Sequence, residues 1–325
     1  MRALRALFFA AVGAAAAVLA SAPAVAQVGM AVAKQGSYTY SAGAAISKVA
    51  SDSGLQMRIQ PFSGSSAYLP AINAGEIDFG LANELETSQA VHGIAMYKGK
   101  PNPKVRAISI MVPFYAAMFV RKDSPIRTVA DLKGKRVTSE YTSAKTLVQL
   151  ISGYLANGGL SYDDVQKVPV PSVPSGADMF AEGKADTFMF ALGAGKVAET
   201  AAKVNGLRAI PISDAPDAVA RLQKVVPVAY PVLVKPGKGR VGVDVPTMLY
   251  AYDYLVLAGT GVPDDAAYKL AKAMHDNKKA MAASFGPLNG FDPNRMVKQL
   301  RGIDWHSGAI RFYKEIGAWP PKSGK

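Results

Sequence analysis

The chain has 325 residues, half of which are hydrophobic, and it contains no cysteine. This composition excludes a disulfide framework, a thiolate nucleophile and a zinc site with thiolate ligands. Lysine and arginine exceed aspartate and glutamate by 37 to 24, but the basic residues are spread along the chain and are not interleaved with aromatic side chains. A nucleic-acid partner is therefore not expected.

The first 26 residues have the pattern of a cleaved secretory signal peptide. Arg2 and Arg5 precede an apolar run from 7 to 19, and Ala24-Val25-Ala26 forms a small-x-small cleavage site. We expect cleavage after Ala26 and a periplasmic mature protein. Loss of the two arginines lowers the formal net charge from +13 to +11.

Residues 28 to 82 alternate between strand and helix patterns. The expected elements are a strand at 28–33, a helix at 41–53 and a strand at 55–60, followed by a loop, a further helix and a further strand. The helix carries Ala42, Ile46 and Val49 on one face and ends before Gly54. Strands that alternate with helices in this way predict a parallel sheet.

Two further apolar runs, expected as strands, lie at 105–112 and 116–121 and carry the chain onward. A second α/β unit is expected to begin near the capped turn at 128–131, followed by a strand at 135–138, a helix at 143–157, and strands at 168–170 and 207–212. Pro113 separates the first two strands, and four prolines between 227 and 246 predict an extended, irregular stretch.

The C-terminal part predicts helix without a sheet of its own. A helix opens at Pro263, carries Leu270, Met274 and Met281 on one stripe, and stops at Gly286-Pro287. We expect it to pack back on the first unit. The prediction is an α/β protein with a discontinuous lobe 1 (27–118 plus 235–325), a lobe 2 (119–234), two or three crossing strands, and a ligand cleft between the lobes.

One pattern occurs twice, 108 residues apart, and supports this two-lobed prediction. Gly75-Glu76-Ile77-Asp78 and Gly183-Lys184-Ala185-Asp186 are each preceded by an apolar helix face and followed by a short apolar strand. Glycine can adopt the left-handed conformation that ends a helix. Each copy therefore predicts one return from a helix to a strand.

The residues that could support catalysis are few. His92, His275 and His306 are the only histidines, and none belongs to a recognisable metal-binding or nucleophilic motif. We expect neither an enzyme nor a bound metal or cofactor.

Small polar loops follow several expected strands and form the candidate ligand site. In open α/β sheets, ligands bind outside the carboxyl ends of the strands. Glycine and serine expose backbone N–H groups there, and helix N-termini add positive potential, so a small organic anion such as a carboxylate is the expected ligand. The candidate contacts are Lys34, Gln35, Ser37, Tyr38, Ser63, Gly64, Ser65, Ser66, Asn83, Tyr141, Thr142, Ser143, Lys145, Leu192 and Tyr252. For each serine, the alternative is a helix cap, and for each tyrosine, a place in the core.

The segment from His306 to Gly317 resembles the H-P-G-A-x-x-Y-Y-x-E-x-G ending of the TAXI family, the solute receptors of one branch of TRAP transporters. Residues 129–137 are similar to the second-lobe entry of type II periplasmic binding proteins, and residues 74–82 fit the same pattern. The resemblance implies a type II periplasmic binding protein whose lobes close on a carboxylate, dicarboxylate-like or amino-acid-like, and deliver it to a membrane TRAP permease.

Two loops depart from the TAXI pattern. The glycine-rich G-G-T-Y-Y-P-x-G is replaced by the sequence at 36–43, and a G-S-G-T type loop is replaced by the sequence at 142–145. A differently shaped pocket is therefore expected. Two alternatives stay open: a binding protein of an ABC importer or sensor system, and an exported enzyme on a related fold.

Overall fold

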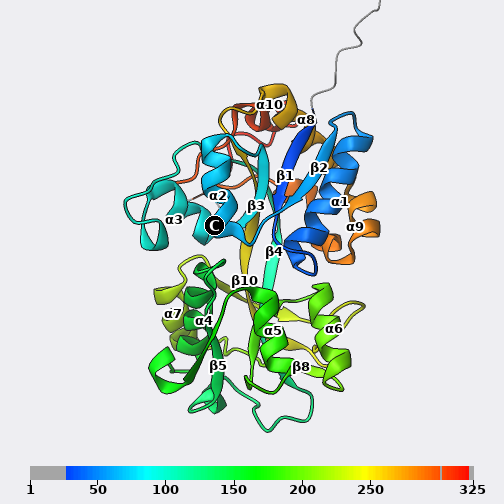
Figure 1. Ribbon diagram of the computed structural model, residues 1–325. Helices are drawn as coiled ribbons and strands as arrows, with labels where there is room; N and C mark the ends of the chain where they lie inside the picture. Colours follow the sequence, from blue (N-terminus) through cyan, green and yellow to red (C-terminus); the bar gives the residue numbers. More distant parts are fainter. Residues whose placement is uncertain (1–26, 301, 322–325) are drawn as a thin grey trace, which may run out of the picture.

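The computed structural model describes residues 27–300 and 302–321. The predicted signal peptide, residues 1–26, lies outside the described residues. Figure 1 shows an α/β molecule with two bodies of helices and strands, joined by two long strands. The predicted two-lobed fold is confirmed.

The first lobe is built on a sheet with the strand order β2-β1-β3-β10-β4. Strand β1 pairs in parallel with β2 and β3, whereas β10 runs antiparallel to β3. The elements that belong to this lobe are β1 (Val28–Val32), α1 (Tyr38–Asp52), β2 (Met57–Pro61), α2 (Ser65–Ala74), β3 (Phe79–Asn83), α3 (Glu84–His92), α8 (Asp264–Asp276), α9 (Lys278–Ser284) and α10 (Ser307–Glu315).

The second lobe repeats the same kind of unit. Strands β5 and β6 pair in parallel, and a bridge between Val137 and Thr187 places the start of β7 on the other side of β5. The elements of this lobe are β5 (Arg136–Glu140), α4 (Thr146–Asn157), β6 (Gln166–Val170), α5 (Val173–Ala181), β7 (Phe188–Ala191), α6 (Gly195–Lys203), β8 (Leu207–Ala209), α7 (Pro216–Val225) and β9 (Tyr230–Val234).

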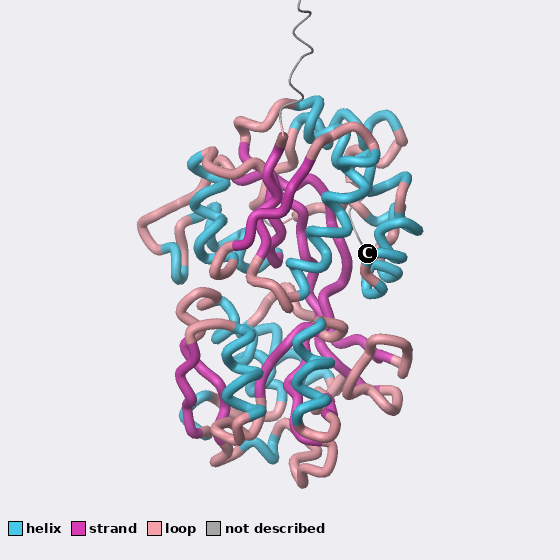
Figure 2. Tube along the Cα trace, turned by 45° about the vertical axis from the view of Figure 1, so that its right-hand side comes forward, coloured by secondary structure: helices cyan, strands magenta, loops and turns pink. Residues whose placement is uncertain are grey.

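The two lobes are joined by β4 (Val105–Arg121) and β10 (Thr247–Gly259), which pair antiparallel. β10 pairs with β3 at one end and with β9 at the other, and β4 pairs with β7 and β8. The same two strands therefore contribute to both lobes, as the tube in Figure 2 shows.

The prediction that Pro113 separates two strands was wrong. Pro113 lies inside the continuous strand β4, opposite Asp253 of β10. Among the described residues no strand pairs with it on its other side, because β7 joins β4 only from Ala116 onward. A proline is tolerated in a strand where its missing N–H faces an open edge.

The repeated Gly-x-x-Asp pattern has the same structure in both lobes. Gly75 and Gly183 have φ values of +80° and +74°, in the left-handed region that favours glycine. The carboxylate of Asp78 accepts a hydrogen bond of 2.8 Å from the backbone N–H of Gly29, and that of Asp186 accepts one of 2.8 Å from Arg136. Each aspartate thereby fixes the start of the neighbouring central strand, and the predicted helix-to-strand returns are confirmed.

The C-terminal helices pack on the first lobe, where α8 and α9 contact α1 and α10 contacts α8. The predicted single helix is divided at Asn277, where α8 ends and α9 begins. The lobe boundaries at 118/119 and 234/235 stay a proposal, because the first falls inside the shared strand β4 and the second at the end of β9.

The stretch from 227 to 246 is more regular than its four prolines predicted, because it contains β9, which pairs with β10. Helix α7, which precedes it, was not predicted; Pro216 occupies its first turn, where a proline needs no N–H partner. Helix α6 was not predicted either. Only Val197 and Thr200 of α6 are buried, so its apolar face is short.

The segment that resembles the TAXI ending, His306 to Gly317, contains the whole of α10 and its caps. His306 is buried, its Nδ1 accepts a hydrogen bond from the backbone N–H of Gly308, and its Nε2 lies 3.1 Å from the carbonyl of Val262. A Cβ added at Gly308 would lie 2.1 Å from the carbonyl oxygen of Asp264. These residues hold α10 against α8, within the first lobe.

Candidate functional site

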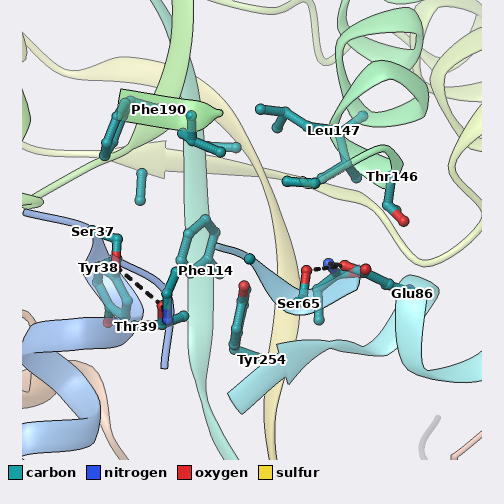
Figure 3. A pocket seen from close by; sticks show the side chains of 18 of the residues that line it. Ser37, Tyr38, Thr39, Ser65, Glu86, Phe114, Thr146, Leu147, Phe190 and Tyr254 are labelled. Atoms are coloured by element: carbon teal, nitrogen blue, oxygen red, sulfur yellow. Dashed lines mark hydrogen bonds between the residues drawn. The ribbon is translucent and has the colours of Figure 1, made fainter. Parts of the chain in front are cut away.

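A cavity of about 100 Å³ lies between the two lobes. Figure 3 shows its walls, with Ser37, Tyr38, Thr39, Ser65 and Glu86 from the first lobe and Thr146, Leu147 and Phe190 from the second. Its floor includes Phe114 of β4 and Tyr252 and Tyr254 of β10, the strands that join the lobes. Because an apolar cavity of about 150 Å³ can hold benzene, this volume corresponds to a small ligand.

Five helices begin at the cavity. The lining residues include the starts or caps of α1 (Ser37), α2 (Ser65), α3 (Asn83), α4 (Thr146) and α5 (Val173). The first N–H groups of a helix have no carbonyl partner within that helix, and the helix dipole adds positive potential at this end. The cavity is therefore suited to an anionic group.

Side-chain caps already bind some of these backbone N–H groups. The hydroxyl of Ser37 accepts a hydrogen bond from the backbone N–H of Tyr40, and the side chain of Asn83 accepts one from Glu86. Gly64 precedes α2 and has no side chain to cap it, so the start of α2 keeps more of its hydrogen-bonding capacity for other partners.

Aromatic rings form most of the floor. The ring of Phe114 packs against Tyr38, Tyr252 and Tyr254 with centroid distances of 4.9, 5.3 and 4.6 Å. On the second lobe the lining is mainly apolar, with Leu147, Leu150, Val173, Pro174, Met189 and Phe190. Such a lining favours a ligand with an apolar part beside its polar group.

Only two residues in this lining carry a formal charge, Lys34 and Glu86. Lys34 is exposed at the mouth of the cavity and forms no ion pair with the described residues. Its ammonium group is available to a ligand. The lining contains no arginine and no histidine, so an anion would depend on the helix starts, on hydroxyl groups and on Lys34.

Glu86 is buried and lies in a cluster of four hydrogen-bond donors. Its Oε2 accepts from Ser65 Oγ at 2.6 Å and from Asn83 Nδ2 at 3.4 Å, and its Oε1 accepts from Tyr97 Oη at 2.9 Å and from Ser66 Oγ at 3.2 Å. Burial raises the pKa of Glu86 above its usual range, and the hydrogen bonds from these four donors oppose that shift.

The two lobes touch around the cavity. The backbone of Gly64 meets the carbonyl of Ser143 so closely that a Cβ at position 64 would lie 2.1 Å from that oxygen. Gln89 Nε2 donates to Gln149 Oε1 at 2.7 Å, and the backbone N–H of Lys196 donates to the carbonyl of Gly36 at 3.3 Å. These contacts, from opposite lobes, describe a closed arrangement.

Eight of the predicted contacts line the cavity: Lys34, Ser37, Tyr38, Ser63, Gly64, Ser65, Asn83 and Tyr252. All of them belong to the first lobe or to the joining strand β10. Their contact with a ligand stays a prediction, which their position supports.

The other seven predicted residues lie outside this lining. Gln35, Thr142 and Lys145 are exposed. Ser66 lies behind the cavity, where its hydroxyl donates to Glu86. The hydroxyl of Ser143 donates to the carbonyl of Pro171 at 2.8 Å. Tyr141 is fully buried within the second lobe, and its hydroxyl donates to Thr138 Oγ1 at 2.6 Å. Leu192 lines a separate hollow beside Tyr115 and Pro287.

Several lining residues were not predicted from the sequence, above all Thr39, Glu86, Phe114, Thr146 and Tyr254. One sequence signal could have identified Glu86, because Asn83 followed three residues later by a glutamate has the spacing of a capping box. The other four follow no local motif. In the described part of the chain no group of three or more acidic, histidine or cysteine side chains could hold a metal ion, and no helix is long and apolar enough to cross a membrane.

Three proteins illustrate what this chain is similar to. A protein of Escherichia coli K12 that is named for the binding of aliphatic sulfonates is 32% identical over 130 residues, which cover 39% of this chain and 37% of that protein. The matched part thus spans little more than a third of that relative. MatC from Rhodopseudomonas palustris, solved with bound malate, has a TM-score of 0.56 at 14% identity and covers 90% of this chain and 97% of its own. PhnD1 from Prochlorococcus marinus, solved with methylphosphonate, has a TM-score of 0.54 at 12% identity and covers 90% of this chain and 99% of its own.

The two solved structures share the two-lobed fold of periplasmic binding proteins with this chain. The family assignment comes from the sequence. The pattern of the NMT1-like family matches residues 30–317, which is nearly the whole described chain. This assignment is coarser than the TAXI resemblance, which stays a hypothesis. The chain belongs to the NMT1-like family and has the fold of periplasmic solute-binding proteins.

Proposed function

We propose that this protein is a periplasmic solute-binding protein that captures a small organic anion with an apolar part and delivers it to an importer. The observation that carries the proposal is the cavity between the lobes, where five helices begin above a floor of aromatic rings. Ligand contacts made with both lobes would favour the closed arrangement, which is the population shift that such a receptor needs.

The anionic group could be a sulfonate or a carboxylate. The Escherichia coli relative favours a sulfonate, whereas the sequence-based expectation was a carboxylate. Both groups accept hydrogen bonds from N–H groups and hydroxyls, and both carry the charge that helix N-termini stabilise. The mature net charge of +11, obtained from +13 by removing Arg2 and Arg5, would assist the approach of either.

The proposed importer is of the ABC type, because the family match and the sulfonate-binding relative both favour it. A TRAP permease is the second candidate. Its support is the sequence from His306 to Gly317, but these residues hold α10 on α8 and take no part in the cavity. Uptake by proteoliposomes would separate the two: an ABC importer requires ATP, whereas a TRAP permease requires an ion gradient.

A thermal-shift experiment tests the ligand class. The mature protein is unfolded and refolded to remove any retained ligand, and is then heated with alkanesulfonates, carboxylates, and neutral sugars and alcohols. A ligand at a thousandfold excess over Kd stabilises the folded state by about 4 kcal/mol. At about 2 to 4 °C per kcal/mol, Tm should rise by about 8 to 16 °C.

The outcomes are distinct. A small organic anion should give the largest shift and should not be consumed during incubation. A neutral sugar that raised Tm while every acid failed would contradict the anion proposal, and steady turnover of the bound acid would contradict a receptor function. A native mass spectrum of freshly purified protein would show directly any ligand that the protein retains.

A further inference from the structure

The polar groups of the cavity are divided between two sides. Figure 3 shows Ser37 and Thr39 on one side and Ser65 and Glu86 on the other, with Phe114 and Tyr254 between them. The first side contains the start of α1 and adjoins Lys34, so it offers positive potential. The second side contains a buried carboxyl group. The two sides therefore favour different parts of a ligand.

The hydroxyl hydrogen atoms that face Glu86 are already committed, whereas the backbone N–H groups at the start of α2 are not capped by a side chain. The two oxygens of Glu86 receive four donors, which fill the lone-pair sites of an ionised carboxylate. The Ser65 hydroxyl uses its one hydrogen in the bond to Oε2. The lone pairs of its oxygen remain, so Ser65 can accept a hydrogen bond from a ligand but has no hydrogen left to donate.

The negative charge of Glu86 also favours a hydrogen-bond donor on this side of the cavity. No lysine or arginine forms an ion pair with Glu86 among the described residues. Burial raises the pKa of Glu86, whereas the hydrogen bonds from its four donors favour the ionised carboxylate. A second anionic group placed here would be repelled. A hydroxyl or ammonium group would instead donate to Ser65 and lie in the field of the carboxylate.

We propose that Ser65 and Glu86 select ligands that carry a hydrogen-bond donor, a hydroxyl or an amine, at the end opposite their anionic group. This inference deepens the proposed function and rests on it. A dianionic ligand is excluded by the same contacts. The ligand class becomes hydroxy- or amino-substituted sulfonates and carboxylates, with Glu86 as the residue that determines specificity.

A purely structural role for Glu86 predicts something different. Tyr97 and Ser66 lie outside the lining. Their bonds to Oε1 could serve only to fix α3 against α2, which carries Ser66, and against the turn Ala95–Tyr97. In that case ligands with and without a donor would bind equally well. The position of Ser65, Asn83 and Glu86 in the wall of the cavity is what separates the two roles.

Matched ligands test the inference on the unmodified protein. Isothermal titration calorimetry compares ethanesulfonate with isethionate, which adds a hydroxyl, and with taurine, which adds an amine. Propionate, 3-hydroxypropionate and β-alanine form the carboxylate series. We expect at least one donor-bearing member of a series to bind tenfold or more tightly than its parent, since a hydrogen bond that involves a charged group is usually this strong.

Two variants identify the residues responsible. Glu86→Gln keeps the side-chain volume but replaces a carboxylate oxygen by an amide that donates, and we expect the preference to fall to threefold or less. Ser65→Ala removes the hydroxyl that would accept a hydrogen bond from the ligand, and it should reduce the preference for donor-bearing ligands to the same extent. If Glu86→Gln does not fold, Ser65→Ala alone tests the inference. The matched control is Glu76→Gln, which makes the same charge change at an exposed position beyond the other end of α2.

The possible failures are distinguishable. If no acid binds the unmodified protein, the proposed function is overturned and this inference with it. If the parent acids bind as tightly as their donor-bearing partners, only this inference is overturned. A preference that persists in both Glu86→Gln and Ser65→Ala would also overturn it, because the donor would then be recognised elsewhere.

Discussion

Gly64→Ala should weaken ligand binding by opposing closure of the lobes. Gly64 precedes α2 in the first lobe, and its backbone lies against the carbonyl of Ser143 in the second. Its φ of 169° is extended backbone that alanine adopts freely, so the substitution adds no local strain. Its effect would come from the contact between the lobes alone.

The size of the effect follows from the distance. A new Cβ would lie 2.1 Å from the Ser143 oxygen, whereas van der Waals contacts of carbon begin near 3.5 Å. The lobes must separate by roughly 1 Å or more to relieve this overlap. Overpacking of this kind usually costs about 1 to 3 kcal/mol, which corresponds to a loss in affinity of roughly 5- to 150-fold.

The assay is calorimetric titration with the tightest-binding acid, combined with small-angle scattering to follow closure. Gly195→Ala is the matched control, because a Cβ at Gly195 has no neighbour within 4 Å. We expect the control to bind normally. Gly64→Ala should keep its Tm without ligand and lose both affinity and ligand-induced compaction. Unchanged affinity together with full compaction would refute the proposed contact between closed lobes.

Three further outcomes are expected. Lys34→Ala should weaken binding of an acid by up to about fivefold, because an exposed charge contributes at most about 1 kcal/mol, and the effect should be smaller at high salt. Calorimetric titration beside Lys314→Ala, a change at another exposed lysine, checks this. Equal binding curves for the two variants would remove Lys34 from the site. Burial lowers the pKa of His306 below its usual range. Its contribution to stability is therefore present above the unfolded pKa of about 6.5 and is lost as pH falls through the folded pKa. The Tm of His306→Asn, which can still cap α10, should fall less between pH 7 and 5 than the Tm of the unmodified protein, and parallel curves of Tm against pH would contradict this. Asp78→Ala should lower the free energy of unfolding by about 1 to 2 kcal/mol, since the N–H of Gly29 loses its acceptor. Thermal unfolding measures this loss, with Asp52→Ala as the control at an exposed position. A Tm equal to that of the control would contradict the role assigned to Asp78.

Local sequence features determined much of the framework. Gly75 and Gly183 needed only their own backbone freedom to end helices, and the apolar runs behind Asp78 and Asp186 became strands. Both patterns depend on neighbours within a few residues. The start of α2 was likewise readable, because serine and glycine before an apolar periodicity mark a helix N-terminus. The first helix begins at Tyr38, three residues before the expected start at 41.

Only the tertiary structure decided which of these ends meet. The loop at 142–145 follows a strand of the second lobe as expected, yet Tyr141 turns into the core, with φ +44°. Of the loop only Ala144 lines the cavity, and the larger lining side chains are those of Thr146 and Leu147 at the start of α4. No local pattern distinguishes these positions, because the backbone twist that selects them depends on packing against β7 and α5.

The strands that join the lobes show the same limit. Pro113 reads as a break between two strands, but β10 pairs along the whole of that segment and carries it through. That pairing brings together residues more than a hundred positions apart, and it places Phe114 beside Tyr252 and Tyr254 on the cavity floor. The sequence alone therefore determined the repeated units and their helix starts, whereas the cavity, with Glu86 in its wall, was decided by contacts between distant segments whose energies no local pattern records.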